Sequence, residues 1–503
     1  MPKRAAQINQ PEISLDQHAT MPLYKQLYER LRAMILAGQL EVGARLPSTR
    51  ALASELGISR NTTALAYELL LLEGYIESRV GDGTRIAKLQ PEQLQQGSRR
   101  STNPSRTEHS DQHVALLSRR SQTLINSPAL DILSSEPGQA GSSVFRVGQP
   151  DVTYFPYEKW AALLARNARQ LLQDYASYQN AQGYGPLREA IAAHIGVTRG
   201  VHCSPEQIVM TAGAQGALDL IARVLLNPGD PVWVEDPGYQ GAYGALLSND
   251  AKMIEIPVDG EGLNVEVGRH LCPEARLAIV TPSHQLPTGV TMSLNRRLAL
   301  LEWAREAQSW IVEDDYDSEY RFSGRPLESL QGLDSTNRVI YIGTFSKVLF
   351  PSLRLGYLVA PPELLKGFIA TRRLIDTHLP LLEQMALADF MGEGHFVRHL
   401  RKMRSLYLER RNALIEALRQ EFGDNVNITI PEAGMHLLAW LPSGVNVQMA
   451  TRQIEASGLH IQLISESRLW AHPRTGLMLG FAGASPEELR KGVKCLAQAL
   501  QGL

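Results

Sequence analysis

A single lysine, Lys347, follows an apolar run in the stretch YIGTFSKVLFPSLRLGY, residues 341–357. Thr344 and Ser346 add hydroxyls to the same turn, and Arg354 adds a planar guanidinium of the kind that binds phosphate with two hydrogen bonds. A lysine attacks an aldehyde only as the neutral amine, so such a site must work against its usual pKa of about 10.4. The lysine, hydroxyls and arginine together suit an aldehyde that carries a phosphate.

Pyridoxal 5′-phosphate is an aldehyde of this kind. A solvated surface loop can have the same composition as this turn, so the turn taken alone leaves both interpretations open. Other segments of the chain carry matching chemistry and favour the cofactor site.

The stretch WIVEDDYDSEY, residues 310–320, ends an apolar run in acidic residues. Residues two apart on a β-strand share a face, so we expect Asp314 and Tyr316 to lie together. A carboxylate on a pyridine nitrogen keeps that nitrogen protonated and makes the ring an electron sink, and a phenol beside it can reach the ring hydroxyl. Asp315 is expected to point the other way and to serve the structure. A shift of one residue in register would give the role of Asp314 to Asp315.

Two further segments suit a phosphate and a flat ring. VMTAGAQGALDL, residues 209–220, reads as a strand, a turn of small residues and a helix, and helix N-termini bind phosphate. Gly213, Ala214 and Gln215 would form that cradle. In VEDPGYQGA, Tyr239 follows a turn and is in position to stack on a ring.

The segment TPSHQLPTG closes another strand with His284 and Gln285, which can both hydrogen-bond a ring substituent. All of these segments follow the carboxyl ends of expected strands. Ligands of parallel-sheet proteins bind outside those ends, so the segments are expected to converge on one site.

The elements that must position these residues are visible in the hydrophobic pattern. From about residue 140 onward, short Val/Ile-rich runs such as QIVMTAG and LAIVTPS alternate with helical patterns. Continuous apolar strands separated by helices indicate a parallel sheet covered on both faces. We therefore expect an α/β domain over residues 140–503.

The first part of the chain, residues 20–88, has a different pattern. A helix is expected to begin at Pro22 and to stop near Gly38, and two short helices follow, which Ser48 and Ser59 can cap around a turn at Gly57. Two short helices joined by a glycine turn are the helix-turn-helix plan. A small helical bundle without DNA function has a similar pattern.

The second of these short helices would place polar residues at its N-terminal end, where a helix-turn-helix contacts DNA. These residues are Arg60, Asn61, Thr62 and Thr63. The stretch that follows reads as two strands around the hairpin signal Gly81-Asp82-Gly83, flanked by Arg79 and Arg85. The whole would be a winged helix-turn-helix with a cationic wing.

Composition limits the remaining classes of function. The net charge of −2 over 503 residues means that any DNA-binding surface must be local. Three widely spaced cysteines argue against a disulfide framework or a zinc cluster, and without a signal peptide or an apolar stretch of membrane-spanning length we expect a cytoplasmic protein with no membrane contact. Residues 89–139 predict a flexible basic linker, acting either as a solvated spacer or as an aid in binding DNA phosphates.

Residues 20–88 resemble the GntR-type DNA-binding domain. The family's patterns G-x-x-L-P-S-x-R-x-L-A and S-R-x-T stand here at 43–53 and 59–62. The resemblance implies that a set of residues faces the double-stranded DNA of an operator: Arg45, Ser48, Arg50, Arg60, Thr62 and the wing at Gly81 to Gly83.

The order of motifs from about residue 140 to the C-terminus resembles the fold-type I aminotransferases. The resemblance implies an aldimine between Lys347 and pyridoxal 5′-phosphate, Asp314 on the pyridine nitrogen, Tyr316 on the ring hydroxyl and Tyr239 stacked on the ring. It implies phosphate contacts from a further set: Ala214, Gln215, Thr344, Ser346 and Arg354. In YQNAQGYG, Tyr178 matches a tyrosine that reaches the phosphate of the neighbouring subunit.

One position departs from this pattern. Aminotransferases usually bind the substrate α-carboxylate with an arginine near the C-terminus, and the corresponding position in GLMLGFAG is Met478. Arg468 and Arg474 lie close by in the sequence and could take that role. If neither does, an amino-acid ligand loses its bidentate anchor.

A GntR-type reader joined by a linker to an aminotransferase-like body resembles the layout of the MocR family of transcriptional regulators. The resemblance implies a domain-swapped homodimer that controls transcription by sensing pyridoxal 5′-phosphate, an amino acid or another amine at Lys347. A working aminotransferase with an accessory DNA-binding domain is the alternative, and a purely structural role for the large domain is a third possibility. The missing arginine favours the cofactor itself, or an amine without an α-carboxylate, as the signal.

Overall fold

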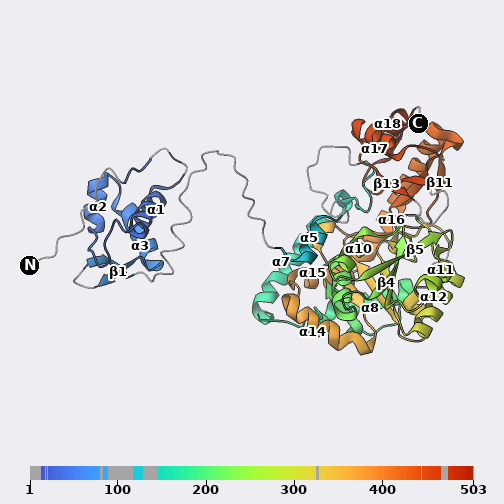
Figure 1. Ribbon diagram of the computed structural model, residues 1–503, viewed down its shortest axis with the longest axis horizontal. Coiled ribbons are helices and arrows are strands. Elements are labelled where there is room, and N and C mark those ends of the chain that lie inside the picture. Colours follow the sequence, from blue (N-terminus) through green and yellow to red (C-terminus); the bar gives the residue numbers. More distant parts are fainter. Residues whose placement is uncertain are drawn as a thin grey trace, which may run out of the picture. The chain divides into compact units, whose positions relative to one another are not determined.

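The computed structural model describes residues 13–16, 19, 21–79, 83–88, 117–127, 144–175, 177–324, 328–442, 444–465 and 474–501. The chain divides into two compact units, residues 1–114 and 115–503. Figure 1 shows a small helical body with a two-stranded hairpin, and a larger α/β body. No helix of the described residues is long and apolar enough to cross a membrane.

The first unit is a three-helix body with a β-hairpin, as predicted. Its elements are α1 (Leu23–Leu36), α2 (Thr49–Leu56), α3 (Arg60–Leu72), β1 (Ile76–Arg79) and β2 (Gly83–Ile86). Helix α2 ends at Gly57, which adopts a left-handed φ of 65° that favours glycine. Leucines and isoleucines at helical spacing, such as Leu27, Leu31 and Leu70, form its core together with Ile76.

The second unit is built on an eight-stranded sheet with the order β3-β10-β9-β8-β7-β4-β5-β6. The strands are β3 (Ile208–Thr211), β4 (Pro231–Asp236), β5 (Lys252–Asp259), β6 (Gly262–Leu263), β7 (Leu277–Val280), β8 (Trp310–Asp315), β9 (Val339–Thr344) and β10 (Gly356–Val359). Strands β5, β4, β7, β8 and β9 pair in parallel. Strand β10 is antiparallel to both of its neighbours, and β6 is antiparallel to β5.

The expected parallel arrangement is confirmed for β5, β4, β7, β8 and β9, whereas β10 and β6, which were not predicted from the sequence, run antiparallel to their neighbours. Residues 345–355 join β9 to β10 without a crossover helix, and so short a connection can only return the chain in the opposite direction. Because β3 and β9 are both antiparallel to β10, they run the same way as each other. The carboxyl ends of β3, β4, β7, β8 and β9 consequently meet at one edge of the sheet.

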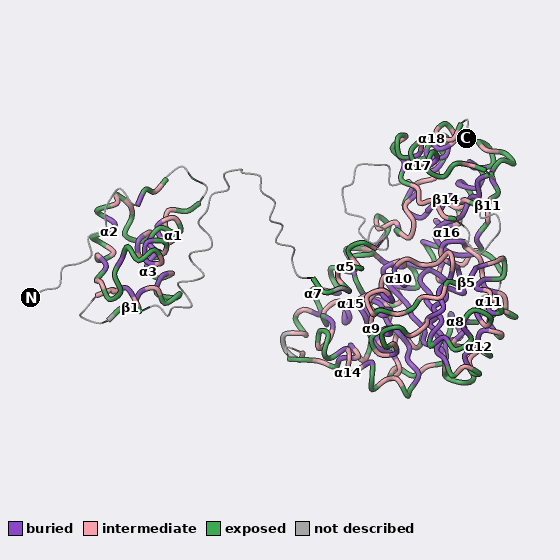
Figure 2. The backbone as a smooth tube through the Cα atoms, viewed as in Figure 1, coloured by how far each residue is buried: buried purple, intermediate pink, exposed green. Residues whose placement is uncertain are grey.

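Helices cover both faces of this sheet, as expected. They are α7 (Tyr157–Asp174), α8 (Gly185–Arg199), α9 (Gly213–Leu225), α10 (Gln240–Leu247), α11 (Val265–Leu271), α12 (Leu294–Ala307), α13 (Leu330–Leu333), α14 (Leu365–Asp376) and α15 (Leu382–Gly392). Alternate residues of β4 show the two faces: Val234 packs in the cluster that contains α9 and α10, whereas Trp233 stacks on Trp303 of α12. In Figure 2 the backbone inside these helices is mostly buried, and strands β3, β7, β8, β9 and β10 are buried at every residue.

The C-terminal part of the second unit forms a smaller sheet with the order β11-β12-β14-β13. It consists of β11 (Asn427–Thr429), β12 (His436–Trp440), β13 (Gln462–Ser465) and β14 (Thr475–Gly480), all antiparallel. Helices α16 (His395–Phe422), α17 (Val447–Ala456) and α18 (Pro486–Ala499) accompany it. In Figure 1 this small sheet lies beside the eight-stranded one.

The linker expected over 89–139 is wrong in one part. Residues Arg119–Ile125 form helix α5, which belongs to the second unit. Ser118 caps this helix, and Arg120 forms an ion pair of 2.8 Å with Asp250. The polar composition of the segment suggested a solvated chain. The ion pair that anchors it joins residues far apart in the sequence, so the composition gave no sign of it. Residues 89–116 and 128–139 of the expected linker lie outside the described residues.

Candidate functional site

The N-terminal end of α3 has the geometry that the sequence predicted. The Oγ of Ser59 accepts a hydrogen bond from the N–H of Thr62 at 3.0 Å, so the helix begins at Arg60. Arg60 and Asn61 are exposed, whereas the hydroxyl of Thr62 is bonded to Ser59 Oγ at 2.8 Å. DNA contact by these residues stays a prediction. Arg60 and Asn61 have exposed side chains that DNA could reach.

Thr63 does not belong to this surface. Its side chain is fully buried, and its hydroxyl has no hydrogen-bond partner within the described residues. Thr63 lies on the same stripe of α3 as Ala66, Tyr67 and Leu70, which face the core of the unit. The expectation that Thr63 contacts DNA was therefore wrong.

The other predicted DNA contacts lie on α2 and the hairpin. Ser48 caps α2 by accepting the N–H of Ala51 at 3.2 Å, and Arg50 is exposed in the first turn. A Cβ at Gly83, whose φ is 75°, would lie 2.8 Å from Nε of Arg45, so the exposed Arg45 lies against the hairpin. Gly81 lies outside the described residues.

Lys347 is half-buried at the edge where the parallel strands end. Its Nζ donates a hydrogen bond of 2.8 Å to the carbonyl oxygen of Gly148. Burial lowers the pKa of Lys347, the carboxyl groups of Asp317 and Asp314 act in the opposite direction, and Arg354 adds to the lowering. The amine therefore has the depressed pKa that attack on an aldehyde requires.

Asp314 is buried at the end of β8, and its Oδ1 has no hydrogen-bond partner within the described residues. Burial, with the nearby Asp315 and Glu235 carboxyl groups, raises its pKa to about 7. An unpaired buried carboxyl group lacks a donor, and a protonated pyridine nitrogen would supply one. This orphaned oxygen fits the role predicted for Asp314.

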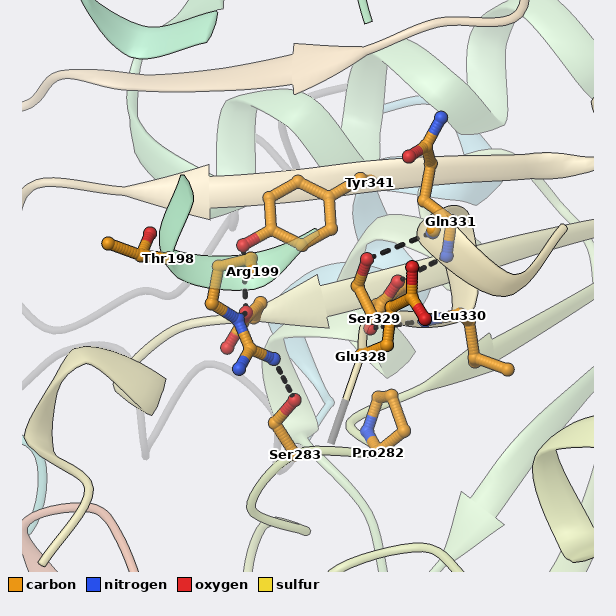
Figure 3. Close-up of polar contacts among 12 residues, drawn as sticks. Thr198, Arg199, Pro282, Ser283, Glu328, Ser329, Leu330, Gln331 and Tyr341 are labelled. Carbon is orange, nitrogen blue, oxygen red and sulfur yellow. Dashed lines mark hydrogen bonds and ion pairs between the residues drawn. The ribbon is translucent and has the colours of Figure 1, made fainter. Parts of the chain in front are cut away.

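Asp315 points away from this site, as the strand periodicity predicted. Its Oδ2 accepts hydrogen bonds of 2.7 Å from Nε of Arg199 and 2.7 Å from the hydroxyl of Tyr341. Figure 3 shows Arg199 between Tyr341 and Ser283, to whose Oγ it also donates. Asp315 therefore has the structural role that was expected. The alternative, in which Asp315 takes the place of Asp314 at the site, is wrong.

The residues predicted to cradle a phosphate lie around the start of α9. Gly213 begins the helix with a φ of 76°, and the guanidinium of Arg354 donates to the Ala212 carbonyl oxygen at 2.9 Å. The backbone of Ala214 lies in the first turn of the same helix. The helix N-terminus and the guanidinium thus lie next to each other, as a phosphate site requires.

Three hydroxyl and amide groups complete the cradle. Ser346 Oγ and Gln215 Oε1 are buried without a hydrogen-bond partner within the described residues. Thr344 Oγ1 accepts the backbone N–H of Ser346 at 3.2 Å, and the amide nitrogen of Gln215 donates to the Gly241 carbonyl oxygen at 2.9 Å. The unpaired atoms are consistent with a ligand that supplies their partners.

Tyr239 lies near Asp314, whereas the side chain of Gln285 is bonded within its own loop. Tyr239 precedes α10, and its hydroxyl has its pKa raised to about 12, chiefly by burial and also by Asp314. Gln285 instead fixes the loop in which it stands, because its amide donates to Glu235 at 3.0 Å and its carbonyl accepts from Thr288 at 2.6 Å. The suggestion that Gln285 bonds a ring substituent was therefore wrong.

His284 belongs to a buried network that sequence reasoning missed. Its Nδ1 lies 3.1 Å from Asp317 and 3.1 Å from the hydroxyl of Tyr316, and that hydroxyl also donates to the His284 carbonyl oxygen at 2.9 Å. The ring of His436, from β12 of the small sheet, lies 4.6 Å from that of His284. The network connects Tyr316 to both sheets.

Four residues near Lys347 were not predicted from the sequence. Asp317 and Glu235 stand inside motifs already noted, and the surplus of carboxyl groups there was the only hint. Gly148 and His436 are distant from the motifs, and only the fold brings them to the lysine.

Tyr178 is exposed on the second unit, whereas Met478 is buried in it. The side chain of Tyr178 is 86% exposed, which suits a group that serves another chain. Met478 is buried in an apolar cluster with Leu438 and Trp440, and Arg474 stacks on Trp440 with 4.6 Å between its guanidinium carbon and the ring. Arg468 lies outside the described residues.

Comparisons with known proteins agree with this two-part organisation. Residues 23–86 match the family of bacterial regulatory proteins called the gntR family, and residues 144–496 match aminotransferase class I and II. Over 492 residues the chain is 41% identical to the probable rhizopine catabolism regulatory protein MocR of Rhizobium meliloti, covering 97% of this chain and 96% of that protein.

The second unit alone has enzyme relatives. The chain is 32% identical over 367 residues to aromatic-amino-acid aminotransferase 1 of Thermococcus litoralis, covering 70% of this chain and 87% of that protein. The crystal structure of LysN, an α-aminoadipate aminotransferase of Thermus thermophilus, superposes with a TM-score of 0.68 at 31% identity, covering 77% of this chain and 97% of LysN. The relative that spans nearly the whole chain is nevertheless a regulator. The chain belongs to the MocR family of transcriptional regulators, in which a GntR-type DNA-binding domain precedes an aminotransferase class I and II domain.

Proposed function

We propose that the chain is a dimeric, DNA-binding transcriptional regulator that holds pyridoxal 5′-phosphate on Lys347 and answers to a small molecule at that site. The observation that carries the proposal is the half-buried Lys347 amine, which bonds the Gly148 carbonyl oxygen and is influenced by the carboxyl groups of Asp314 and Asp317, in a chain that also carries a helix-turn-helix. A lysine whose pKa is shifted by desolvation and by specific charged neighbours is typical of a functional site.

The residues present fit the cofactor. The start of α9, Ser346 and Arg354 suit its phosphate, and Asp314 suits its ring nitrogen. When bound, pyridoxal 5′-phosphate supplies an aldehyde that condenses with primary amines. The LysN structure was solved with N-(5′-phosphopyridoxyl)-L-leucine, a compound of the same cofactor, which supports this assignment.

The chain's own groups have defined tasks in this scheme. Burial lowers the pKa of Lys347, which favours the neutral amine that would bond the aldehyde carbon, and Asp314 would hold a proton on the ring nitrogen. Tyr316, whose hydroxyl contacts His284, would bond the ring hydroxyl. A ligand that engages this site can change DNA binding only by its difference in affinity between two arrangements of the dimer.

The proposal can be tested with DNA fragments selected from a random pool by the purified protein. We expect the affinity for the selected fragment to change when pyridoxal 5′-phosphate is added to cofactor-free wild type, and to stay constant for Lys347→Ala. An equal response of both proteins would refute a sensing role for Lys347.

Transamination is a second candidate, favoured by the complete set of cofactor residues and by the 32% identity to an aminotransferase. An enzyme releases a carbonyl product in repeated turnovers from an amino donor and a keto-acid acceptor. A regulator changes its DNA affinity without accumulating product. Product analysis by mass spectrometry after prolonged incubation separates the two functions.

A further inference from the structure

The wall of the Lys347 site that is formed by the small sheet is apolar. Register places His436, Leu438 and Trp440 of β12 opposite Gly480, Met478 and Gly476 of β14, so these residues share one face. The ring of His436 lies 4.6 Å from that of His284, and a Cβ at Gly480 would lie 3.0 Å from Cα of Val147, so this face borders the Lys347 site. Met478, Leu438 and Trp440 form a cluster with Val147, Leu286 and Ile464.

This wall continues directly to the lysine. Val147 of the cluster precedes Gly148, whose carbonyl oxygen accepts the Lys347 amine, and Leu286 stands two residues after His284. A group on the carbon next to a bound amine would therefore meet methyl, thioether and indole surface on this side.

The charged groups around Lys347 are mostly acidic. Asp317 and Asp314 act on its amine with Arg354, and Glu235 acts on Asp314 in turn. The guanidinium of Arg354 donates to the Ala212 carbonyl oxygen at the start of α9, where it would bind the cofactor's phosphate. Arg474 stands at the exposed start of β14 and stacks on Trp440.

The two imidazoles of the site do not balance these acids. His436 is buried, and burial holds its pKa well below the usual value, so it is neutral. Nδ1 of His284 lies 3.1 Å from Asp317 Oδ2, so this ring nitrogen already has a carboxyl partner. A carboxylate placed here would lose its water and meet acidic and apolar neighbours instead.

From these observations we infer that the Lys347 site selects a primary amine whose amine-bearing carbon carries no carboxylate, with Met478 as the residue that sets this specificity. The inference rests on the proposed function and names the class of its signal. An apolar or uncharged substituent matches the wall, and the ammonium form of the amine is attracted by the acids on its way in.

The test uses the full-length protein loaded with pyridoxal 5′-phosphate and amines in matched pairs. Phenylalanine and 2-phenylethylamine differ only by the carboxylate, as do leucine and 3-methylbutylamine. Two readouts are followed, the absorbance of the bound cofactor and the melting temperature. We expect each amine to act at a concentration at least about tenfold lower than its amino acid, which is one decade in apparent Kd.

A gain-of-function variant tests the role of Met478 itself. Met478→Arg places a guanidinium on the same face and should lower the half-effective concentration of the amino acids by about tenfold or more relative to the amines. Met478→Leu changes the side chain without adding charge and should keep the preference for amines. The wild-type titrations decide the inference even where Met478→Arg fails to fold.

Three outcomes have distinct meanings. A preference for the amines in both pairs supports the inference. Amino acids that act as well as or better than their amines overturn it while leaving the proposed function intact. A protein that takes up no pyridoxal 5′-phosphate refutes the proposed function, and the inference with it.

Discussion

Arg199 Nε lies 2.7 Å from Asp315 Oδ2, and both side chains are almost completely buried. The arginine comes from the last residue of α8 and the aspartate from the last residue of β8. Because Asp314 precedes Asp315 and points to the opposite face, the ion pair fixes the direction in which Asp314 faces. A structural ion pair thus orients a residue of the proposed cofactor site.

Arg199→Met should destabilise the protein strongly. It leaves Asp315 as a buried carboxylate with only Tyr341 as a described hydrogen-bond donor, and breaking a buried pair in this way costs about 3–5 kcal/mol. Thermal or urea unfolding of the cofactor-free protein measures the loss. The matched control is Arg269→Met, since Arg269 and Glu306 form a pair of the same 2.7 Å length that is partly exposed. That variant should lose about 1 kcal/mol or less, and equal losses in the two variants would contradict the role given to burial.

Lys347→Ala should abolish the absorbance of covalently bound cofactor while the protein keeps its fold. The variant removes the only amine that the structure places beside Asp314 and Asp317 within the described residues. Spectra with added pyridoxal 5′-phosphate, together with circular dichroism, check both parts. A cofactor band of wild-type intensity in this variant would show that another lysine holds the aldehyde.

The local parts of this organisation were accessible from the sequence because they depend on short-range rules. The twofold period of a strand separated Asp314 from Asp315, and serine caps marked the starts of α2 and α3. The same rule of helical spacing would have assigned Thr63 to the core, had its stripe with Ala66 and Leu70 been followed back to the helix start.

The remaining parts depend on contacts between distant segments. Gly148 meets Lys347, and Arg199 meets Asp315, across more than a hundred residues each. His436 reaches His284 only because β12 of the small sheet lies against the edge of the large sheet. No periodicity in a single sequence encodes such pairs. Strand β10 was not predicted from the sequence, and its antiparallel direction follows from the short connection that joins it to β9.

Arg60→Ala should weaken DNA binding and relax sequence preference, because Arg60 is exposed at the start of α3, where base edges are read. A loss of about 1–3 kcal/mol is expected if the arginine contacts a guanine. Fluorescence anisotropy with the selected fragment and with scrambled DNA gives both quantities. Unchanged discrimination between the two DNAs would contradict the assignment.

Thr63→Val, in contrast to Arg60→Ala, should leave DNA binding unchanged. It removes a buried hydroxyl that has no partner within the described residues and replaces it with a methyl group of similar size. We expect DNA affinity to stay within about twofold of wild type and stability to stay the same or rise by up to about 1 kcal/mol. A large loss of DNA affinity in a folded variant would restore Thr63 to the interface.

Asp314→Asn should flatten the pH dependence of stability in the cofactor-free protein. The folded-state pKa of Asp314 is raised from 3.8 to about 7, so its contribution to stability is present at low pH and is lost as the pH rises through about 7. The asparagine does not titrate, so the variant should gain in melting temperature relative to wild type from about pH 5 to about pH 8. A difference between the two proteins that is constant over this range would contradict the raised pKa.

Tyr178 allows a direct test of whether the cofactor site is shared between two chains. Its side chain is 86% exposed in one chain, which is unusual for a residue predicted to contact a buried cofactor, unless a second chain brings the two together. Tyr178→Phe should weaken cofactor binding by about ten- to a hundredfold, the cost of one hydrogen bond to a charged group. Lys347→Ala should remove covalent binding altogether.

A mixed dimer of these two variants, isolated with two different affinity tags, separates the possibilities. If each site takes its lysine from one chain and its tyrosine from the other, the mixed dimer contains one intact site and one that lacks both groups. Half of its sites should then bind the cofactor covalently with wild-type affinity, as measured by absorbance titration. If Tyr178 serves its own chain, every site in the mixed dimer lacks either the lysine or the tyrosine hydroxyl, and only the weak affinity of Tyr178→Phe is observed. Recovery of tight binding on mixing can therefore arise only from a site shared between two chains.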